Sequence, residues 1–427
     1  MMPMKLLAVG DLHLGRAPSR LPDELTERAR ELGPGEAWRR VVDAAIEGGV
    51  HAVTLSGDVV EGEYDFFEGY RELATGVERL LEADIHVLGV VGNHDVKVLP
   101  RLASQIEGFQ LLGSGGVWQR ETLEIGGECL TLHGWSFAQP AVRNSPLSRH
   151  SFERGPGPNL GVLHCDRDQS GSAYAPVSTA ELEAAGLDGW LLGHIHAPDP
   201  LALEHPVGYL GSAIGLDPGE PGARGPWLIT IENGLISSID HWALAPLHWE
   251  RLSVDLSGIE SPEDARDRLL EATNALEQTL SSRPMPPEAA GLRVTFTGRT
   301  NLRSAVETLF DNENLRDLHA GNGRTHYFVE RLRYATQPGL DLATLAQHSD
   351  PPGLLARRRQ LLERPADDPD RHALIQDTRK HLSDRAKKTY WRPLDGSSLA
   401  EEAATEWLRQ AGLSALDQLL EQRESGG

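Results

Sequence analysis

Five segments in the first half of the chain place possible metal ligands directly after short apolar runs. In chain order they are Gly10-Asp11-Leu12-His13, Gly57-Asp58, Gly92-Asn93-His94-Asp95, His164 and Gly193-His194-Ile195-His196. Carboxylate, amide and imidazole donors in this mixture suit a pair of divalent Mn, Fe or Zn ions better than Mg or Ca. Two such ions make hydroxide available near neutral pH and neutralise phosphate oxygens, which is what phosphoester hydrolysis needs.

The apolar runs before these residues are typical of β-strands. Strands are predicted at 5–9, 51–55, 85–91, 129–132, 160–163, 190–192 and 227–231, and helices at 36–47, 66–82 and 179–185. Early alternation of strands and helices predicts a layered α/β architecture. Open α/β sheets bind ligands at the carboxyl ends of their strands, so the five segments are expected to meet at one rim.

The chain changes character near residue 247. "WERLSVDLSG", "GLRVTFTG" and "THYFVERLRY" read as strands, with helices expected at 262–280 and 302–309. A Pro- and Gly-containing linker follows, and then a charged helical tail from about residue 353. We therefore predict three regions, which are 1–247, a small α+β domain at 248–335, and a linker with a helical region at 336–427.

Composition limits the partners. The 427 residues carry a net charge of −22, and residues 1–250 hold 17 Lys+Arg against 35 Asp+Glu. This acidity fits cation binding and argues against a generally basic nucleic-acid binder. No run approaches the ~20 apolar residues of a membrane span. Two cysteines are too few for a disulfide framework, so we expect a cytoplasmic protein and no membrane partner.

The order D-x-H, GD, GNHD, H and GHxH resembles the calcineurin-like metallophosphoesterase superfamily. Within it, "DLHLG", "LHCDRDQSGSAYAP" and "GYLGSAIGLDPGEPGARGPWLITI" most resemble the Mre11/SbcD nucleases, and among them the bacterial YhaO-like exonuclease group. The resemblance implies a layered two-sheet sandwich with a small α+β capping domain and a helical C-terminal tail. It also implies a Mn²⁺-dependent DNA exonuclease or endonuclease acting on DNA ends in repair.

The resemblance assigns roles to the residues that match the motifs. One metal would be held by Asp11, His13, Asp58 and His196, and the other by Asp58, Asn93, His164 and His194, with Asp58 as the bridge. His94 would face the scissile phosphate, where it stabilises charge or protonates the leaving 3′-oxygen. Asp95 would orient His94 as a hydrogen-bond acceptor.

Four other residues leave alternatives open. Many family members carry Asp or His three positions after the bridging Asp, whereas this chain has Glu61, which either orients a neighbour or leaves one contact absent. Cys165 is read as a buried apolar residue in preference to a soft ligand. His133 is read as structural. Tyr174 is equally compatible with substrate contact and with packing.

The later regions predict partners. A solvated surface explains most arginines of the capping domain as well as DNA contact does. The candidates for DNA-phosphate contacts are Arg293, Arg299, Arg303, Arg316, Arg324, Arg331 and Arg333. The basic stretch 371–392 could lie on DNA or on a partner. A final helix, capped by Ser398, has an apolar stripe at Leu399, Ala403, Trp407 and Ala411, with Leu408, Leu416, Leu419 and Leu420 beside it. Such a stripe packs either within the chain or against a partner. The resemblance implies an SMC-like ATPase of the Rad50/SbcC type and a homodimer.

Two rival functions are compatible with the same residues. The first is a phosphatase or cyclic-nucleotide phosphodiesterase of the same fold, although such enzymes usually lack a capping domain and a docking tail. The second is a non-catalytic scaffold that binds DNA or an ATPase, against which the full set of ligand residue types argues.

Overall fold

The computed structural model describes residues 2–63, 66–148, 150–318, 324–339, 341–386 and 401–425. The chain divides into two compact units. The first comprises Met1–Val254, Glu263–Phe296 and Glu307–Tyr334, and the second comprises Asp255–Pro262, Thr297–Val306 and Ala335–Gly427. Each unit is described by itself below. The three predicted regions, with their two boundaries, remain a prediction.

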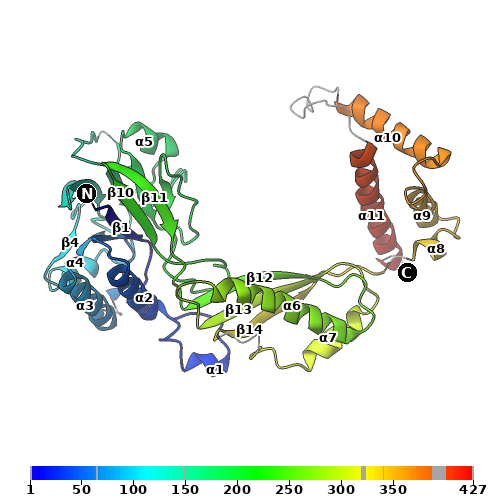
Figure 1. Cartoon of the computed structure of the whole chain (residues 1–427), viewed down its shortest axis with the longest axis horizontal. Coiled ribbons are helices and arrows are strands. Elements are labelled where there is room, and N and C mark those ends of the chain that lie inside the picture. Colours follow the sequence, from blue (N-terminus) through cyan, green and yellow to red (C-terminus); the bar gives the residue numbers. More distant parts are fainter. Residues whose placement is uncertain are drawn as a thin grey trace. The chain divides into compact units, whose positions relative to one another are not determined.

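The first unit contains a six-stranded sheet, in the order β11-β10-β1-β2-β3-β4 (Figure 1). Strands β1 to β4 run parallel, and β10 and β11 are antiparallel to their neighbours. The bounds are β1 Met4–Val9, β2 Ala52–Ser56, β3 His86–Val90, β4 Phe109–Leu111, β10 Trp227–Glu232 and β11 Leu235–His241. Sequence patterns predicted β1, β2, β3 and β10. They missed β4, which has three residues, and β11, which is mostly polar.

A second sheet of five strands has the order β5-β6-β7-β8-β9. Strands β6 to β9 are parallel, and β5 pairs with β6 in the antiparallel sense. The bounds are β5 Trp118–Ile125, β6 Glu128–Trp135, β7 Asn159–His164, β8 Gly189–Gly193 and β9 Val207–Tyr209. The edge strands β5 and β9 were not predicted. The sequence of β5, "WQRETLEI", is half exposed and mostly polar, so it lacks the apolar run that marks a buried strand.

The two sheets pack face to face. Alternate residues of β1 point to opposite sides, as the pleat of a strand requires. Met4, Leu6 and Ala8 join a buried cluster with Leu130 of β6 and Leu160 of β7. The other face of β1 packs against helices α2 (Pro34–Glu47) and α3 (Phe66–Glu82). The predicted layered two-sheet α/β sandwich is therefore confirmed.

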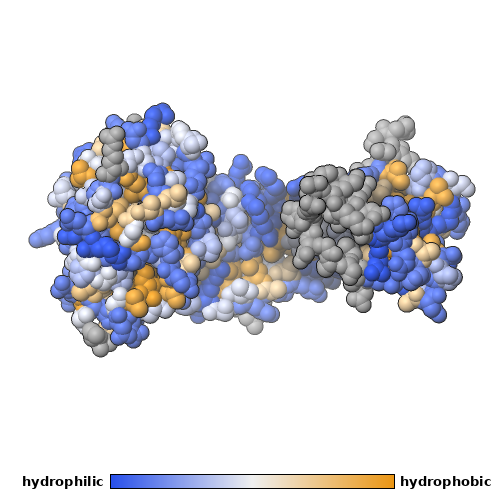
Figure 2. Space-filling model, turned by 90° about the horizontal axis from the view of Figure 1, so that it is seen from above, coloured by the Kyte–Doolittle hydropathy of each residue, from blue (hydrophilic) through white to orange (hydrophobic). Residues whose placement is uncertain are grey.

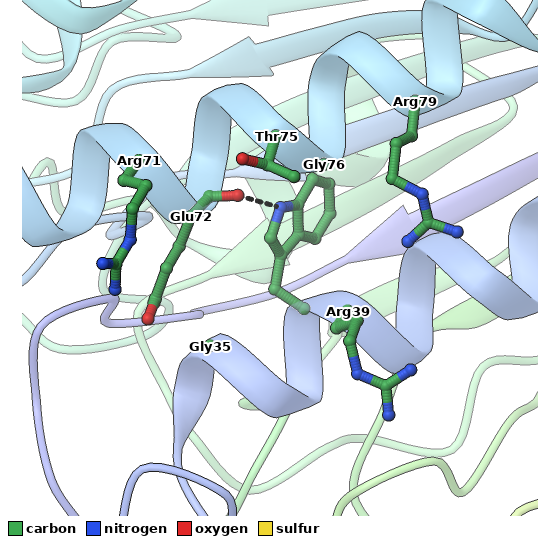
Figure 3. Close-up of a pocket in the computed structure, with 8 residues that line it drawn as sticks. Gly35, Arg39, Arg71, Glu72, Thr75, Gly76 and Arg79 are labelled. Atoms are coloured by element: carbon green, nitrogen blue, oxygen red, sulfur yellow. Dashed lines mark hydrogen bonds between the residues drawn. The ribbon is translucent and has the colours of Figure 1, made fainter.

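Helices α2 and α3 fit together around a tryptophan. The Trp38 indole Nε1–H donates to the backbone oxygen of Glu72, 3.2 Å away (Figure 3). A Cβ on Gly76 would lie only 2.1 Å from Trp38 Nε1, so glycine is what lets the helices approach. A shallow pocket beside this contact is lined by Gly35, Arg39, Arg71, Thr75 and Arg79. Arg39 and Arg79 both form ion pairs with Asp43, so the positive charges of these two pocket residues are already partnered within the protein.

Short helices complete the first part of the chain. They are α1 Asp23–Thr26, α4 Leu99–Ala103 and α5 Thr179–Ala184. Helix α5 was predicted and begins with a capping box, in which Ser178 and Glu181 satisfy each other's backbone N–H groups. Helices α1 and α4 have four and five residues, too few to show a helical period.

The region after residue 247 forms a three-stranded sheet, β12-β13-β14, with helices α6 and α7. The bounds are β12 Leu247–Asp255, α6 Pro262–Ser281, β13 Ala289–Thr297, α7 Arg303–Asp311 and β14 His326–Tyr334. This matches the predicted α+β pattern.

Within the first unit, part of this sheet packs in a common core with residues from the start of the chain. Trp249 and Phe328 pack with Leu25 and Leu32 in one buried cluster. Two salt bridges join the same surfaces: Glu288 accepts from Arg28 at 2.8 Å and from the nearly buried Arg40 at 2.9 Å.

The second unit contains the C-terminal helices α8 Leu342–Leu345, α9 Pro351–Leu361, α10 Pro369–Ala386 and α11 Glu401–Ser425. Ala404 of α11 is buried against Leu362 and Ile375, with Leu408 packed beside it. Trp407 is 61% exposed, so the face that packs within the chain lies next to the predicted stripe. The predicted cap Ser398, Leu399, residues 387–392 of the basic stretch and the side chain of Ala403 lie outside the described residues.

The surface is mixed in polarity. On the face seen in Figure 2, hydrophilic residues predominate and hydrophobic ones gather in small patches. Among the described helices, none combines the length and apolar character that crossing a membrane requires.

Candidate metal centre

The predicted ligands meet at the carboxyl ends of strands from both sheets. Asp11 and His13 follow β1, Asp58 follows β2, and Asn93 and His94 follow β3, whereas His164 ends β7 and His194 and His196 follow β8. Three groups have ligand atoms within 4.8 Å of one another. They are Asp11–His13–His196, Asp58–His164–His194 and His13–Glu61–His94.

Unusual backbone conformations aim these side chains. His13 and Asp58 have φ values of 52° and 48°, in the left-handed region that side chains other than glycine rarely adopt. The N–H groups of Leu12 and His13 both donate to the Asp58 backbone oxygen, which ties the loop after β1 to the loop after β2. Gly92 packs closely against Asp58, because a Cβ on Gly92 would lie 2.1 Å from Asp58 Oδ1. Two tied loops thus hold Asp58 in the centre of the site.

His13 and His196 face each other through nitrogen atoms. Their Nε2 atoms are 3.0 Å apart, and each Nδ1 lies 2.6 Å from a carboxylate, Glu61 for His13 and Glu220 for His196. If each Nδ1–H donates to its glutamate, both Nε2 lone pairs point at one another. Two facing lone pairs require a proton or a metal cation between them. With Asp11 beside them, they fit a divalent metal ion.

His164 repeats this arrangement on the other side of Asp58. Its Nδ1 lies 3.0 Å from the Ser56 backbone oxygen, to which Nδ1–H can donate. Its Nε2 lies 3.0 Å from Asn93 Oδ1 and 3.3 Å from Asp58 Oδ2. If His164 Nδ1–H donates to Ser56, the Nε2 lone pair of His164 faces the oxygens of Asn93 and Asp58, an arrangement that fits a second cation.

The His194 imidazole lies close to His164, and the residue contacts two neighbouring carboxylates. Nε2 of His194 is 3.2 Å from Asp166 Oδ1, and its backbone N–H donates to Asp11 at 3.0 Å. If Nε2–H donates to Asp166, Nδ1 of His194 is unprotonated, and its lone pair is available to a metal ion.

The electrostatics agree with a cation site. Burial lowers the pKa of His164, but the Asp58 and Asp11 carboxylates outweigh burial and raise that pKa to about 9. Burial would raise the pKa of Asp58, yet His164 and His13 hold it well below its usual range. In the absence of metal, His164 therefore keeps its proton at neutral pH while Asp58 stays ionised. Because metal ligands must lose their protons, metal binding should strengthen as pH rises.

The structure corrects the predicted role of Asp95. Its side chain is fully buried, and its two oxygens accept the backbone N–H groups of Val59 at 2.7 Å and Gly92 at 2.8 Å. Burial, followed by the neighbouring Asp58 charge, raises the pKa of Asp95 to about 7. Asp95 therefore braces the two ligand loops. The nearest carboxylate that the described residues offer to the His94 ring is instead Glu61, 3.8 Å from Nδ1.

Sequence reasoning assigned no definite role to the three carboxylates that contact the imidazole rings. Glu61 was left open as an orienting residue, and the structure places it against His13. Asp166 stands two positions after His164, a spacing that would have brought it to the same rim. Glu220 lies in the Gly- and Pro-rich loop 217–226, where no sequence signal distinguishes it from an ordinary loop residue.

The remaining candidates lie as follows. Cys165 is fully buried, and burial raises the pKa of its thiol, which favours the apolar reading. His133 is buried, with Nε2 3.1 Å from Asn159 Oδ1, which fits a structural role. Tyr174 is 39% exposed, with its ring centroid 5.1 Å from that of His194.

At least three of the seven candidate arginines for DNA contacts already pair with carboxylates, and one of them is Arg331, 4.0 Å from Glu330. Arg293 donates to Glu330 at 2.7 Å, and Arg316 donates to Asp23 at 3.2 Å. Which arginines contact DNA stays a prediction.

Comparisons with known proteins agree with the site. Residues 4–198 match the calcineurin-like phosphoesterase family, and residues 249–337 match the middle domain of metallophosphoesterase YhaO. The chain thus contains a calcineurin-like metallophosphoesterase region and resembles the group that includes YhaO and Mre11. This match supports metal-dependent phosphoesterase activity.

The individual similarities are modest. The chain is 26% identical to "Uncharacterized metallophosphoesterase YhaO" of Bacillus subtilis over 60% of its own length and 64% of that protein. It is also 26% identical to "DNA double-strand break repair protein Mre11" of Haloferax volcanii, over 62% and 58% of the two chains. The matches thus span less than two thirds of either relative. Among solved structures, TT1561 of Thermus thermophilus aligns with a TM-score of 0.33 at 13% identity, covering 56% of this chain and 99% of that one.

Proposed function

We propose that this protein is a two-metal DNA nuclease that cleaves phosphodiester bonds at DNA ends. The observation that carries the proposal is the pair of donor groups on either side of Asp58, next to an imidazole, His94, that is 43% exposed. The match to the YhaO middle domain and the similarity to an Mre11 DNA repair protein favour DNA over small phosphomonoesters.

In this proposal the seven ligands divide as their positions suggest. Asp11, His13 and His196 hold one ion, Asn93, His164 and His194 hold the other, and Asp58 serves both. When bound, the ions activate water and neutralise the phosphate oxygens, and Mn²⁺ suits this mixture of oxygen and nitrogen donors. His94 touches the substrate, where it stabilises developing charge or protonates the leaving 3′-oxygen.

The later helices supply the proposed partner surface. Trp407 projects from α11 next to the face that packs within the chain, and an exposed tryptophan is a common anchor of protein interfaces. We propose that this surface binds an SMC-like ATPase of the Rad50/SbcC type in a cytoplasmic DNA-repair complex, and that the chain forms a homodimer. A Trp407→Ala variant should lose ATPase binding in a pull-down while keeping metal-dependent hydrolysis. Undiminished binding would reject this surface.

The nuclease proposal has a direct test. Purified protein with Mn²⁺ should release nucleotides or short oligonucleotides from end-labelled duplex DNA, and EDTA should stop the reaction. His94→Gln should abolish hydrolysis but retain bound metal. A protein that hydrolyses p-nitrophenyl phosphate but leaves DNA intact would be a phosphatase. One that binds no divalent metal would favour a scaffold.

A further inference from the structure

Glu61 reaches two imidazoles with its two carboxylate oxygens. Oε2 lies 2.6 Å from His13 Nδ1, a short hydrogen bond, and Oε1 lies 3.8 Å from His94 Nδ1, an electrostatic contact. The rings of His13 and His94 are themselves in edge contact, with centroids 5.3 Å apart. Glu61 therefore connects a predicted metal ligand with the residue proposed to face the substrate.

The backbone fixes Glu61 in this place. Its N–H donates to the Leu14 oxygen at 3.1 Å, and Leu14 pairs with Val60 in an isolated parallel bridge. The backbone of the loop after β1 is thus hydrogen-bonded to that of the loop after β2 just beyond His13 and Asp58. A side chain at position 61 consequently emerges beside His13 whatever its type, and glutamate has the length to reach His94 as well.

Glu220 provides an internal comparison. Its Oε1 lies 2.6 Å from His196 Nδ1, and its Oε2 accepts the backbone N–H of Leu216 at 2.8 Å. Its second oxygen is therefore used to hold a loop, whereas that of Glu61 is turned toward His94. The two glutamates share one task, holding an imidazole by Nδ1, and differ in the other.

We propose that Glu61 is a positioning residue with two tasks. It keeps His13 in the Nδ1–H form, so that the Nε2 lone pair points toward His196 and the metal, and it holds His94 beside the same ion. This inference rests on the proposed nuclease function for the role of His94, but its first task concerns metal binding alone.

Three variants separate the two tasks of Glu61. Glu61→Ala removes both, Glu61→Gln keeps an oxygen that can accept from Nδ1–H but removes the charge near His94, and Glu220→Ala removes the corresponding hydrogen bond of His196 only. The control is Glu63→Gln on the same loop, because Glu63 pairs with Lys97 at 3.4 Å. Circular dichroism and thermal melting show whether each variant folds.

The readouts are Mn²⁺ titration by calorimetry, the His13 tautomer by ¹⁵N NMR of the metal-free protein at a pH high enough for His13 to be neutral, and kcat at saturating Mn²⁺. Glu61→Ala and Glu220→Ala should each weaken one Mn²⁺ site by about 10- to 100-fold, the usual effect of losing such a partner. Excess Mn²⁺ should restore turnover in Glu220→Ala but not in Glu61→Ala. Glu61→Gln should bind Mn²⁺ nearly normally and still turn over slowly, and Glu63→Gln should match the wild type.

Two results would overturn the proposal. Wild-type Mn²⁺ affinity and an unchanged His13 tautomer in Glu61→Ala would reject the first task. Full recovery of turnover by Glu61→Ala in excess Mn²⁺ would reject the second. Failure of the nuclease proposal would look different: the wild type itself would leave DNA intact, while Mn²⁺ affinity and the tautomer would still judge the first task.

Discussion

Gly92 lies against Asp58 so closely that a Cβ on Gly92 would fall 2.1 Å from Asp58 Oδ1 and 2.5 Å from its backbone nitrogen. The absence of a side chain at one strand end therefore makes room for the central carboxylate of the site. Asp95 accepts the N–H of Gly92 and that of Val59, which holds the two loops at this separation.

Gly92→Ala should therefore displace Asp58. We expect at least about a tenfold loss of Mn²⁺ affinity, and overpacking should lower the free energy of unfolding by roughly 1–3 kcal/mol. Calorimetric titration and chemical denaturation measure the two effects. Unchanged affinity in a folded variant would show that Asp58 is not held by this contact.

Metal removal should destabilise the protein. The facing acceptors of His13 and His196, and of His164 and Asp58, repel one another until a cation or proton lies between them. A metal that binds only the folded state adds about 2.7 kcal/mol at a free concentration of 100 Kd. The melting temperature should rise with Mn²⁺ and fall with EDTA, and Asp58→Asn should show a much smaller shift. An equal shift in Asp58→Asn would place the stabilising metal elsewhere.

Tyr174 should contribute to DNA binding. Its exposed ring lies beside His194, where it can stack on a nucleobase, an interaction worth about 1–3 kcal/mol per base. Tyr174→Ala should raise KM for DNA while sparing hydrolysis of bis-p-nitrophenyl phosphate, whereas Tyr174→Phe should resemble the wild type. Equal losses on both substrates would instead assign Tyr174 to packing of the site.

Gly76→Ala should destabilise the contact between α2 and α3. The new Cβ would lie 2.1 Å from Trp38 Nε1, and the fully buried indole cannot swing aside. Overpacking costs roughly 1–3 kcal/mol and exceeds the gain of about 1 kcal/mol from replacing a helical glycine. Gly412→Ala in α11 is the control, since its nearest neighbouring atom would be 3.6 Å away. A higher melting temperature for Gly76→Ala would contradict this packing argument.

His133 should make stability depend on pH. Burial lowers its pKa below 6.5, so the unfolded chain takes up a proton on His133 before the folded protein does. The unfolded state then binds more protons, and stability falls as pH drops from about 7 through the folded pKa. His133→Phe removes this proton uptake, so urea denaturation should show a smaller loss between pH 7 and pH 5 than in the wild type. Identical losses in both proteins would remove His133 as the cause.

Much of the fold and the types of ligand were readable from the sequence because their signals are local. The strands β1, β2, β3, β7 and β8 are continuous apolar runs, since strands buried on both faces need apolar residues at every position. Each run stops at a polar residue, which marks the strand end. Strand β5 was not predicted because half of its surface is exposed and polar.

Only the tertiary structure decided which residues touch. His13 meets Glu61 from 48 positions away and His196 from 183 positions away, and no short-range pattern encodes such pairings. The predicted partner of His94 was its sequence neighbour Asp95, yet burial turned that carboxylate to backbone N–H groups and left Glu61 nearer to the ring. Sequence determined the residue types at the strand ends, whereas the packing of two sheets determined which of these side chains face one another.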